Sequence, residues 1–214
     1  MMKKNILILD LIFYVAVPLL VWNGGRGMLG DYYAMLLSSV PGIIYSLYRF
    51  FEVKKVNFFG LFILINLVIG TLIDVLAGSA IQLLWNNAYY LFVLGGVFLI
   101  SIIINKPIAL LFTLDVVELQ GSDREKTKEL FYRKKPLLVF KWITLAFAMR
   151  DIVLGVVKIY LIREYGVDAF DKGILLRQAF SWGVTLLTVF GYYYITKIMA
   201  ENSTDKKDGS NPIL

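Results

Sequence analysis

The stretch from Lys141 to Tyr165 reads KWITLAFAMRDIVLGVVKIYLIREY. It has the length and the apolar composition of a membrane-spanning helix, yet Arg150 and Asp151 stand side by side at its middle. A charged side chain at the centre of a bilayer costs at least about 2.5–3.5 kcal/mol, so such residues rarely face lipid. We therefore expect other helices of the chain to receive both side chains.

The composition of the whole chain indicates the same class of protein. Of its 214 residues, 58% are hydrophobic and 18% are charged, whereas soluble domains average roughly 45–50% and ~25%. The apolar residues form blocks long enough to cross a bilayer, where a backbone must satisfy its own hydrogen bonds. We predict an all-α fold, a polytopic membrane protein whose single domain over 1–200 is a bundle of six transmembrane helices, at 5–22, 33–51, 57–77, 80–104, 137–162 and 174–198.

The long connection at 105–136 is predicted to be cytoplasmic or interfacial. Its first part, PIALLFTLDVVELQ (107–120), is apolar but too short to cross the membrane comfortably. Ser122 and Glu125 have the spacing of a capping box, which predicts a charged helix beginning near Ser122. The polar segment 201–214 is predicted to be a disordered cytoplasmic tail.

Lysine and arginine predict the orientation, because cytoplasmic loops of membrane proteins are enriched in them. The side that contains the N-terminus, the connections at 51–56 and 105–136 and the tail, with Arg49 and Lys197 at the adjoining helix edges, holds 15 of the 22 Lys and Arg residues. The opposite side holds Arg26, Arg163 and Lys172. Both termini are therefore expected in the cytoplasm.

A basic cluster, Arg133, Lys134 and Lys135, stands just before the fifth predicted helix. We expect this cluster to act as an orientation signal. The alternative is that it binds anionic lipid headgroups. The basic residues that give the chain its formal net charge of +6 cluster beside membrane segments. Because membrane orientation accounts for this charge, we predict no nucleic-acid partner.

The chain contains no cysteine and no histidine. Their absence excludes disulfides, thiolate chemistry and the usual zinc, haem and copper ligands, and we predict no metal and no cofactor. Gly25, Gly27 and Gly30 match G-x-G-x-x-G, but the dinucleotide-binding motif requires a preceding strand. We predict a flexible turn over 23–32 instead.

Polar residues recur at helical spacing within the apolar blocks. Two rows with four-residue spacing lie on the third and fourth predicted helices, which a tight hairpin joins: Asn66, Gly70 and Asp74, then Gln82, Asn86 and Tyr90. The predicted intramembrane polar network in the outer half comprises Asp74, Gln82, Asn86, Asn87, Arg150, Asp151, Lys158, Arg177, Gln178 and Ser181. Asp74 and Asp151 are candidate counter-ions for Lys158, Arg177 and Arg150, and Asp74 is the best acidic candidate for Arg150 on another helix. The spacing leaves open whether this layer is a packed network or lines a cavity.

The fifth and sixth predicted helices each carry a stripe of polar and small residues at alternating spacings of three and four. The stripes are Lys141, Thr144, Ala148, Asp151, Gly155 and Lys158, and Gln178, Ser181, Thr185, Thr188 and Tyr192. Such residues commonly mediate helix packing in membranes, so we predict that the two stripes face each other.

Several short motifs resemble the bacterial intracellular septation protein A group and, more closely, its uncharacterised relatives. They are YSLYRF (45–50), followed by a basic loop and a helix opening at Asn57, SIIINKPIALLF (101–112), FKWITLAFAMRDIVL (140–154) and LLRQAFSWGV (175–184). The resemblance implies a protein of the bacterial cytoplasmic membrane that is linked to envelope synthesis or cell division.

Two functions are consistent with these features. The first is a non-catalytic component of envelope assembly or division, which works with the lipid bilayer and with membrane-protein partners or further copies of itself. The alternative is a small transporter or channel for a polar or ionic solute, which uses the outer polar layer.

Overall fold

The computed structural model describes residues 8–52 and 57–208, and every element in this part of the chain is a helix. Two compact units are formed, one from Met1–Gly95 with Arg150–Ser181 and the other from Gly96–Met149 with Trp182–Leu214. The all-α prediction is confirmed. The predicted single domain over 1–200 stays a prediction.

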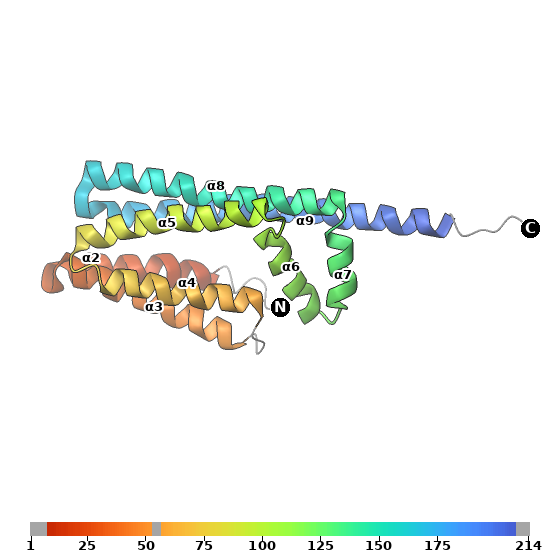
Figure 1. Cartoon of the computed structure of the whole chain (residues 1–214). Helices are drawn as coiled ribbons and strands as arrows, with labels where there is room; N and C mark the ends of the chain where they lie inside the picture. Colours follow the sequence, from red (N-terminus) through yellow and green to blue (C-terminus); the bar gives the residue numbers. More distant parts are fainter. Residues whose placement is uncertain (1–7, 53–56, 209–214) are drawn as a thin grey trace, which may run out of the picture. The chain divides into compact units, whose positions relative to one another are not determined.

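The first unit begins with a π-helical turn, η1 (Ile12–Ala16), that leads into α2 (Val17–Leu29), α3 (Asp31–Glu52) and α4 (Phe58–Val75). These helices lie side by side (Figure 1). The flexible turn predicted over 23–32 is wrong, because α2 continues to Leu29. Only Gly30, with a φ of 78°, takes the left-handed conformation that reverses the chain.

The helix α5 (Ala80–Ile103) follows α4 after a short turn in which Gly78 has a φ of 73°. The side chain of Asn57 caps α4 by accepting a hydrogen bond from the backbone amide of Gly60 at 2.8 Å. The α4–α5 hairpin therefore forms close to the bounds predicted from the apolar pattern.

The last two long helices are α8 (Lys134–Tyr165) and α9 (Ala169–Asp208), joined by the 3-10 turn η2 (Gly166–Asp168). The first eight residues of the segment predicted as a disordered tail belong to α9. No glycine or proline stands between Gly191 and Gly209 to interrupt this part of the helix. The remaining residues, 209–214, lie outside the described part of the chain.

One end of the first unit is held by an apolar core that includes Trp22, Met35, Leu84 and Ile162. Beside this core, the Arg26 guanidinium lies 4.5 Å from the centre of the Trp22 ring. The same group donates hydrogen bonds to Asp31 at 3.1 Å and to Asp168 at 2.6 Å. The end of α2, the start of α3 and the turn η2 are thereby tied together.

The second unit contains α6 (Ile108–Leu119) and α7 (Arg124–Phe131), which pack against each other and share a core with Phe140 and Ile195. The Thr144 hydroxyl accepts a hydrogen bond from the backbone amide of Ala109 at 3.2 Å. The Thr113 and Tyr192 hydroxyls lie 2.7 Å apart. Thr144 of α8 and Tyr192 of α9 thus both contact α6.

The prediction that the stripes of α8 and α9 face each other stays a prediction, and several stripe residues also contact other helices. In the first unit, Gly155 of the α8 stripe lies against the Phe92 ring of α5, where an added Cβ would come within 2.9 Å. In the second unit, Gly191 of α9, which is not a stripe residue, lies against Ile143 of α8. Small and polar residues permit close packing against any helix, so the pattern marks contact faces without identifying all their neighbours.

Four helical segments in the described residues are long and apolar enough to cross a membrane: Ile8–Leu29, Asp31–Phe51, Phe58–Val75 and Ala80–Ile103. They indicate a membrane protein. The helices α8 and α9 are not among them; in α8 the apolar residues are interrupted by Lys141, Arg150, Asp151 and Lys158. The count of six spans stays a prediction.

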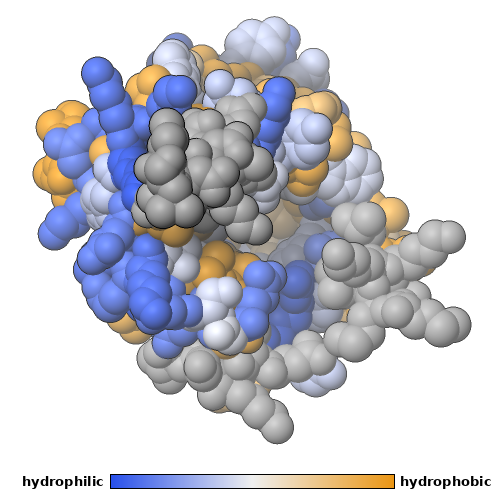
Figure 2. All heavy atoms as spheres, turned by 90° about the vertical axis from the view of Figure 1, so that its right-hand side faces the viewer, coloured by the Kyte–Doolittle hydropathy of each residue, from blue (hydrophilic) through white to orange (hydrophobic). Residues whose placement is uncertain are grey.

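The helix α7 begins one residue later than its predicted capping box. Asp123, not Ser122, is the N-cap, and its carboxylate accepts hydrogen bonds from the amides of Glu125 at 3.0 Å and Lys126 at 3.2 Å. A carboxylate is favoured at this position because it also interacts with the helix dipole. Figure 2 shows hydrophilic residues, such as those that make up much of α7, over a large part of the face that it draws.

Replacing Asp123 with alanine is expected to speed hydrogen exchange at the amides of Glu125 and Lys126. The hydrogen bonds from these amides, Lys126 first, hold the pKa of the Asp123 carboxyl below its usual value. The cap therefore stabilises α7 at neutral pH and is lost as the pH falls through this lowered pKa. Amide hydrogen exchange measured by mass spectrometry provides the test, and Ser122→Ala is the control. Equal effects of the two substitutions would contradict the assignment of Asp123 as the cap.

Candidate functional site

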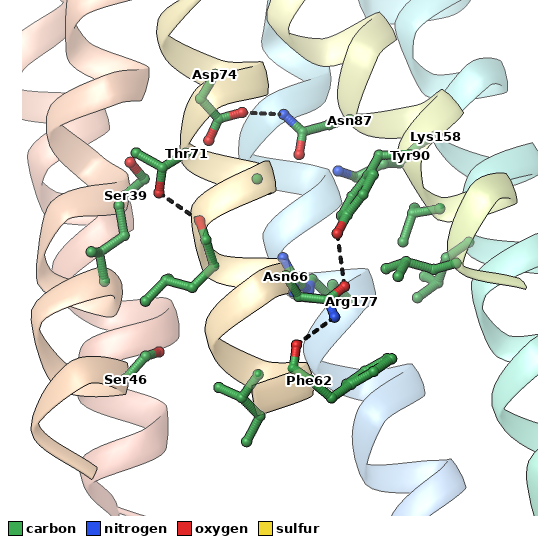
Figure 3. Close-up of a pocket in the computed structure, with 17 residues that line it drawn as sticks. Ser39, Ser46, Phe62, Asn66, Thr71, Asp74, Asn87, Tyr90, Lys158 and Arg177 are labelled. Carbon is green, nitrogen blue, oxygen red and sulfur yellow. Dashed lines mark hydrogen bonds between the residues drawn. The ribbon is translucent and has the colours of Figure 1, made fainter. Parts of the chain in front are cut away.

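A cavity of about 320 Å³ lies within the first unit, between α3, α4, α5 and the parts of α8 and α9 that belong to this unit (Figure 3). Its lining combines apolar side chains, chiefly leucine and isoleucine, with several polar groups, as in many ligand sites. The polar and charged residues that line it are Ser39, Ser46, Asn66, Thr71, Asp74, Asn87, Tyr90, Lys158 and Arg177.

The α4–α5 hairpin supplies two cross-helix hydrogen bonds to one wall of this cavity. The Asn87 amide donates to Oδ1 of Asp74 at 2.7 Å, and the Tyr90 hydroxyl donates to Oδ1 of Asn66 at 2.7 Å (Figure 3). Because residues three or four positions apart share a helix face, both helices present their polar groups to the same side. These bonds fix the depth at which α4 and α5 face each other.

The neutral side chains use their donor groups within the protein. Ser39 donates to the Leu36 carbonyl at 2.7 Å and Thr71 to the Leu67 carbonyl at 2.8 Å. The Asn66 amide donates to the Phe62 carbonyl at 2.7 Å (Figure 3). Such bonds satisfy hydroxyl and amide groups without the help of water, as helices in a membrane require.

The charged side chains differ from the neutral ones. Lys158 from α8 is partly buried and Arg177 from α9 is exposed, and both lie within electrostatic range of Asp74 from α4. Within residues 8–52 and 57–208, neither cation forms a hydrogen bond or an ion pair. The cavity therefore presents two cationic side chains and one carboxylate that no direct ion pair joins within the described residues.

Four residues of the predicted polar network line this one cavity, namely Asp74, Asn87, Lys158 and Arg177. Gln82 and Asn86 are bonded to each other at 2.7 Å on an exposed face instead. Gln178 and Ser181 are not among the lining residues. Among the described residues there is no group of three acidic side chains that could hold a metal ion.

The prediction that Asp74 is the partner of Arg150 is wrong. The Nε and Nη2 atoms of Arg150 both lie 2.8 Å from Oδ1 of its neighbour Asp151, while the Asp74 carboxylate binds Asn87. Adjacent positions on a helix diverge by about 100°, but the long arginine side chain bends back across this angle. The Asp151 side chain is only 2% exposed.

Sequence reasoning did not place Ser39, Asn66, Thr71 and Tyr90 in the network, although all four line the cavity. The four-residue spacing of Asn66, Gly70 and Asp74 contained the signal for the α4 wall. On α5 the row beginning at Gln82 contributes only Tyr90 to the cavity, and the second polar residue of this wall is Asn87, three residues before Tyr90.

The chain matches no protein-family model, and neither a curated protein nor a solved structure matches it.

Proposed function

We propose that the chain is a membrane transporter or channel for a small polar or ionic solute, with the cavity between α3, α4, α5, α8 and α9 as its binding site. The observation that supports this function is the presence of Lys158 and Arg177, without ion pairs in the described residues, beside a cavity of about 320 Å³. Charges at membrane depth that do not neutralise one another commonly mark solute pathways.

The proposal places six spans in a bacterial cytoplasmic membrane, with α8 and α9 as the fifth and sixth spans and both termini inside. The Arg26–Asp168 bond supports this topology, because it joins the end of α2 to the turn between α8 and α9. Reporter fusions at Arg26 and Asn202 are expected on opposite sides of the membrane, and the same side for both would exclude this topology.

Transport is tested by uptake of labelled lactate, alanine and choline into proteoliposomes. Gly70 lines the cavity, and a Cβ added there meets no atom within 4 Å, so Gly70→Leu fills the cavity without a backbone clash. We expect this variant to reduce uptake to background. Gly96→Leu is the matched control, since Gly96 is an equally open helical glycine that does not line the cavity. Equal uptake by both variants, or none by the unmodified protein, would refute the proposal.

A second candidate function is a non-catalytic role in envelope assembly or division, which rests on the motifs that resemble the septation protein A group. Arg133, Lys134 and Lys135 support a membrane-surface role, because all three are exposed and form no side-chain ion pair within the described residues. Such a cluster attracts anionic lipid headgroups. Crosslinking in living cells followed by identification of envelope-synthesis proteins tests this role, and its absence alongside active transport would exclude it.

A further inference from the structure

We infer that the cavity takes a small anion that also carries a hydrogen-bond donor, with the anionic group between Lys158 and Arg177 and the donor on Asp74 and Asn87. This inference rests on the proposed role of the cavity as a solute site, and it names the chemical class of the solute.

The first step is to identify which hydrogen-bond donors of the cavity lining are already used within the protein. Ser39, Asn66, Thr71 and Tyr90 all donate to acceptors within the protein, and Ser46 shares a hydrogen bond with Tyr14 at 2.8 Å. The Asn87 amide donates to Asp74 and to the Leu83 carbonyl at 3.0 Å. A neutral solute that only accepts hydrogen bonds would therefore find few neutral side-chain donors in this cavity.

The second step concerns the donors that remain. Within the described residues, the lining side chains whose donor groups are unused are the cationic Lys158 and Arg177. Asp74 offsets only one of these two positive charges, so an anionic group that binds here meets an excess of positive charge, which favours it in a partly dehydrated site. Carboxylate and phosphate oxygens both suit an arginine and a lysine.

The third step concerns the acceptors. Oδ1 of Asp74 is bound by Asn87, whereas Oδ2 of Asp74 and Oδ1 of Asn87 receive no hydrogen bond from the described residues. The Asp74–Asn87 bond holds these two acceptors close together. A hydroxyl or ammonium group of the solute can donate hydrogen bonds to these acceptors. A solute that carries only an anionic group offers no donor and leaves the Asp74 carboxylate beside a like charge.

The size of the cavity selects small ligands. A volume of about 320 Å³ lies at the lower end of the range for small-molecule sites. A lipid headgroup that contains phosphate and ammonium has the same pair of groups as a free hydroxy acid or amino acid. The shared chemistry is an anion joined to a donor, and the experiment must separate the two sources.

Isothermal titration of the full-length protein in phosphatidylcholine nanodiscs tests the inference with four probes of similar size. Lactate and alanine carry an anionic group and a donor, propionate carries the anionic group alone, and lactamide is the neutral counterpart of lactate. We expect lactate and alanine to bind about tenfold more tightly than propionate, because a hydrogen bond to a charged group is lost with propionate. We expect no measurable binding of lactamide.

The variants Lys158→Met and Arg177→Gln are each expected to weaken lactate binding roughly tenfold to hundredfold. Arg163→Gln is the control, because Arg163 is an exposed cation of α8 that does not line the cavity. In nanodiscs that also contain phosphatidylethanolamine, weaker lactate binding would assign the site to the lipid headgroup, and unchanged binding would assign it to the dissolved solute. Either result keeps the inferred chemistry.

Binding of lactamide as tight as that of lactate, or equal lactate affinity in Lys158→Met, Arg177→Gln and Arg163→Gln, would overturn the inference. Uptake of choline that Gly70→Leu abolishes, without binding of any anion, would also overturn it while leaving the transport function intact. Selective lactate binding without uptake would support the inferred chemistry and refute transport.

Discussion

Replacement of Arg150 by leucine is expected to lower the free energy of unfolding by about 3–5 kcal/mol, the usual cost of removing one member of a buried ion pair. The Arg150 guanidinium lies 2.8 Å from Oδ1 of Asp151, whose side chain is 2% exposed. In addition, Oδ2 of Asp151 is buried without a hydrogen-bond partner in the described part of the chain. The variant therefore leaves a buried carboxylate without its arginine partner.

The pairing itself is tested by a double-mutant cycle. Arg150→Leu combined with Asp151→Leu is expected to recover much of the lost stability, because no uncompensated charge remains. The control combines Arg150→Leu with Asp74→Leu, which should not recover stability, since Asp74 binds Asn87. The measurement is thermal unfolding of the purified variants in detergent. Additive losses for Arg150 and Asp151 would contradict the pairing of these neighbours.

The second large effect is expected at Arg124, which joins α6 and α7. Its Nη1 atom lies 2.5 Å from Oδ1 of Asp115 and 2.7 Å from Oε2 of Glu118. The side chain of Asp115 is completely buried, while that of Arg124 is 34% exposed. Arg124→Met is therefore expected to destabilise the second unit by about 3 kcal/mol, because a buried carboxylate loses its cation.

Two further variants make this result specific. Adding Asp115→Asn to Arg124→Met is expected to restore part of the stability, since the buried group is then neutral. Lys128→Met is the control, because the Lys128–Glu125 pair is 47% and 75% exposed, and exposed pairs contribute about 0–1 kcal/mol. The measurement is again thermal unfolding. A loss of similar size for Lys128→Met would show that the burial of Asp115 is not the cause.

Much of the helical framework could be predicted from the sequence, because long apolar blocks have few alternatives in a membrane. The α4–α5 hairpin is the clearest case, since its polar ends were expected at one depth and Asp74 does bond to Asn87. The cap of α7 was misplaced by one residue. Ser122 and Asp123 are both common N-caps, and sequence alone does not decide between adjacent candidates.

The Arg150–Asp151 pair shows why the polar contacts were harder to predict than the helices. The angle of about 100° between adjacent helix positions describes where each Cβ points. An arginine guanidinium, however, reaches several ångströms from its Cβ and can bend back towards its neighbour. The stripe on α8 shows a related limit. Thr144 contacts α6 and Gly155 contacts α5, so a regular stripe identifies a face that packs but not the helices that cover it.

The net charge of the cavity would determine how the proposed transport responds to the membrane voltage. Lys158, Arg177 and Asp74 together carry a net charge of +1, so a bound monoanion brings the site to electrical neutrality. A charge moved through the bilayer exchanges about 2.3 kcal/mol with each 100 mV of potential. If a carrier moves this site from one side of the membrane to the other, voltage would therefore affect the step in which the site is empty. It would scarcely affect the step in which the site holds a monoanion.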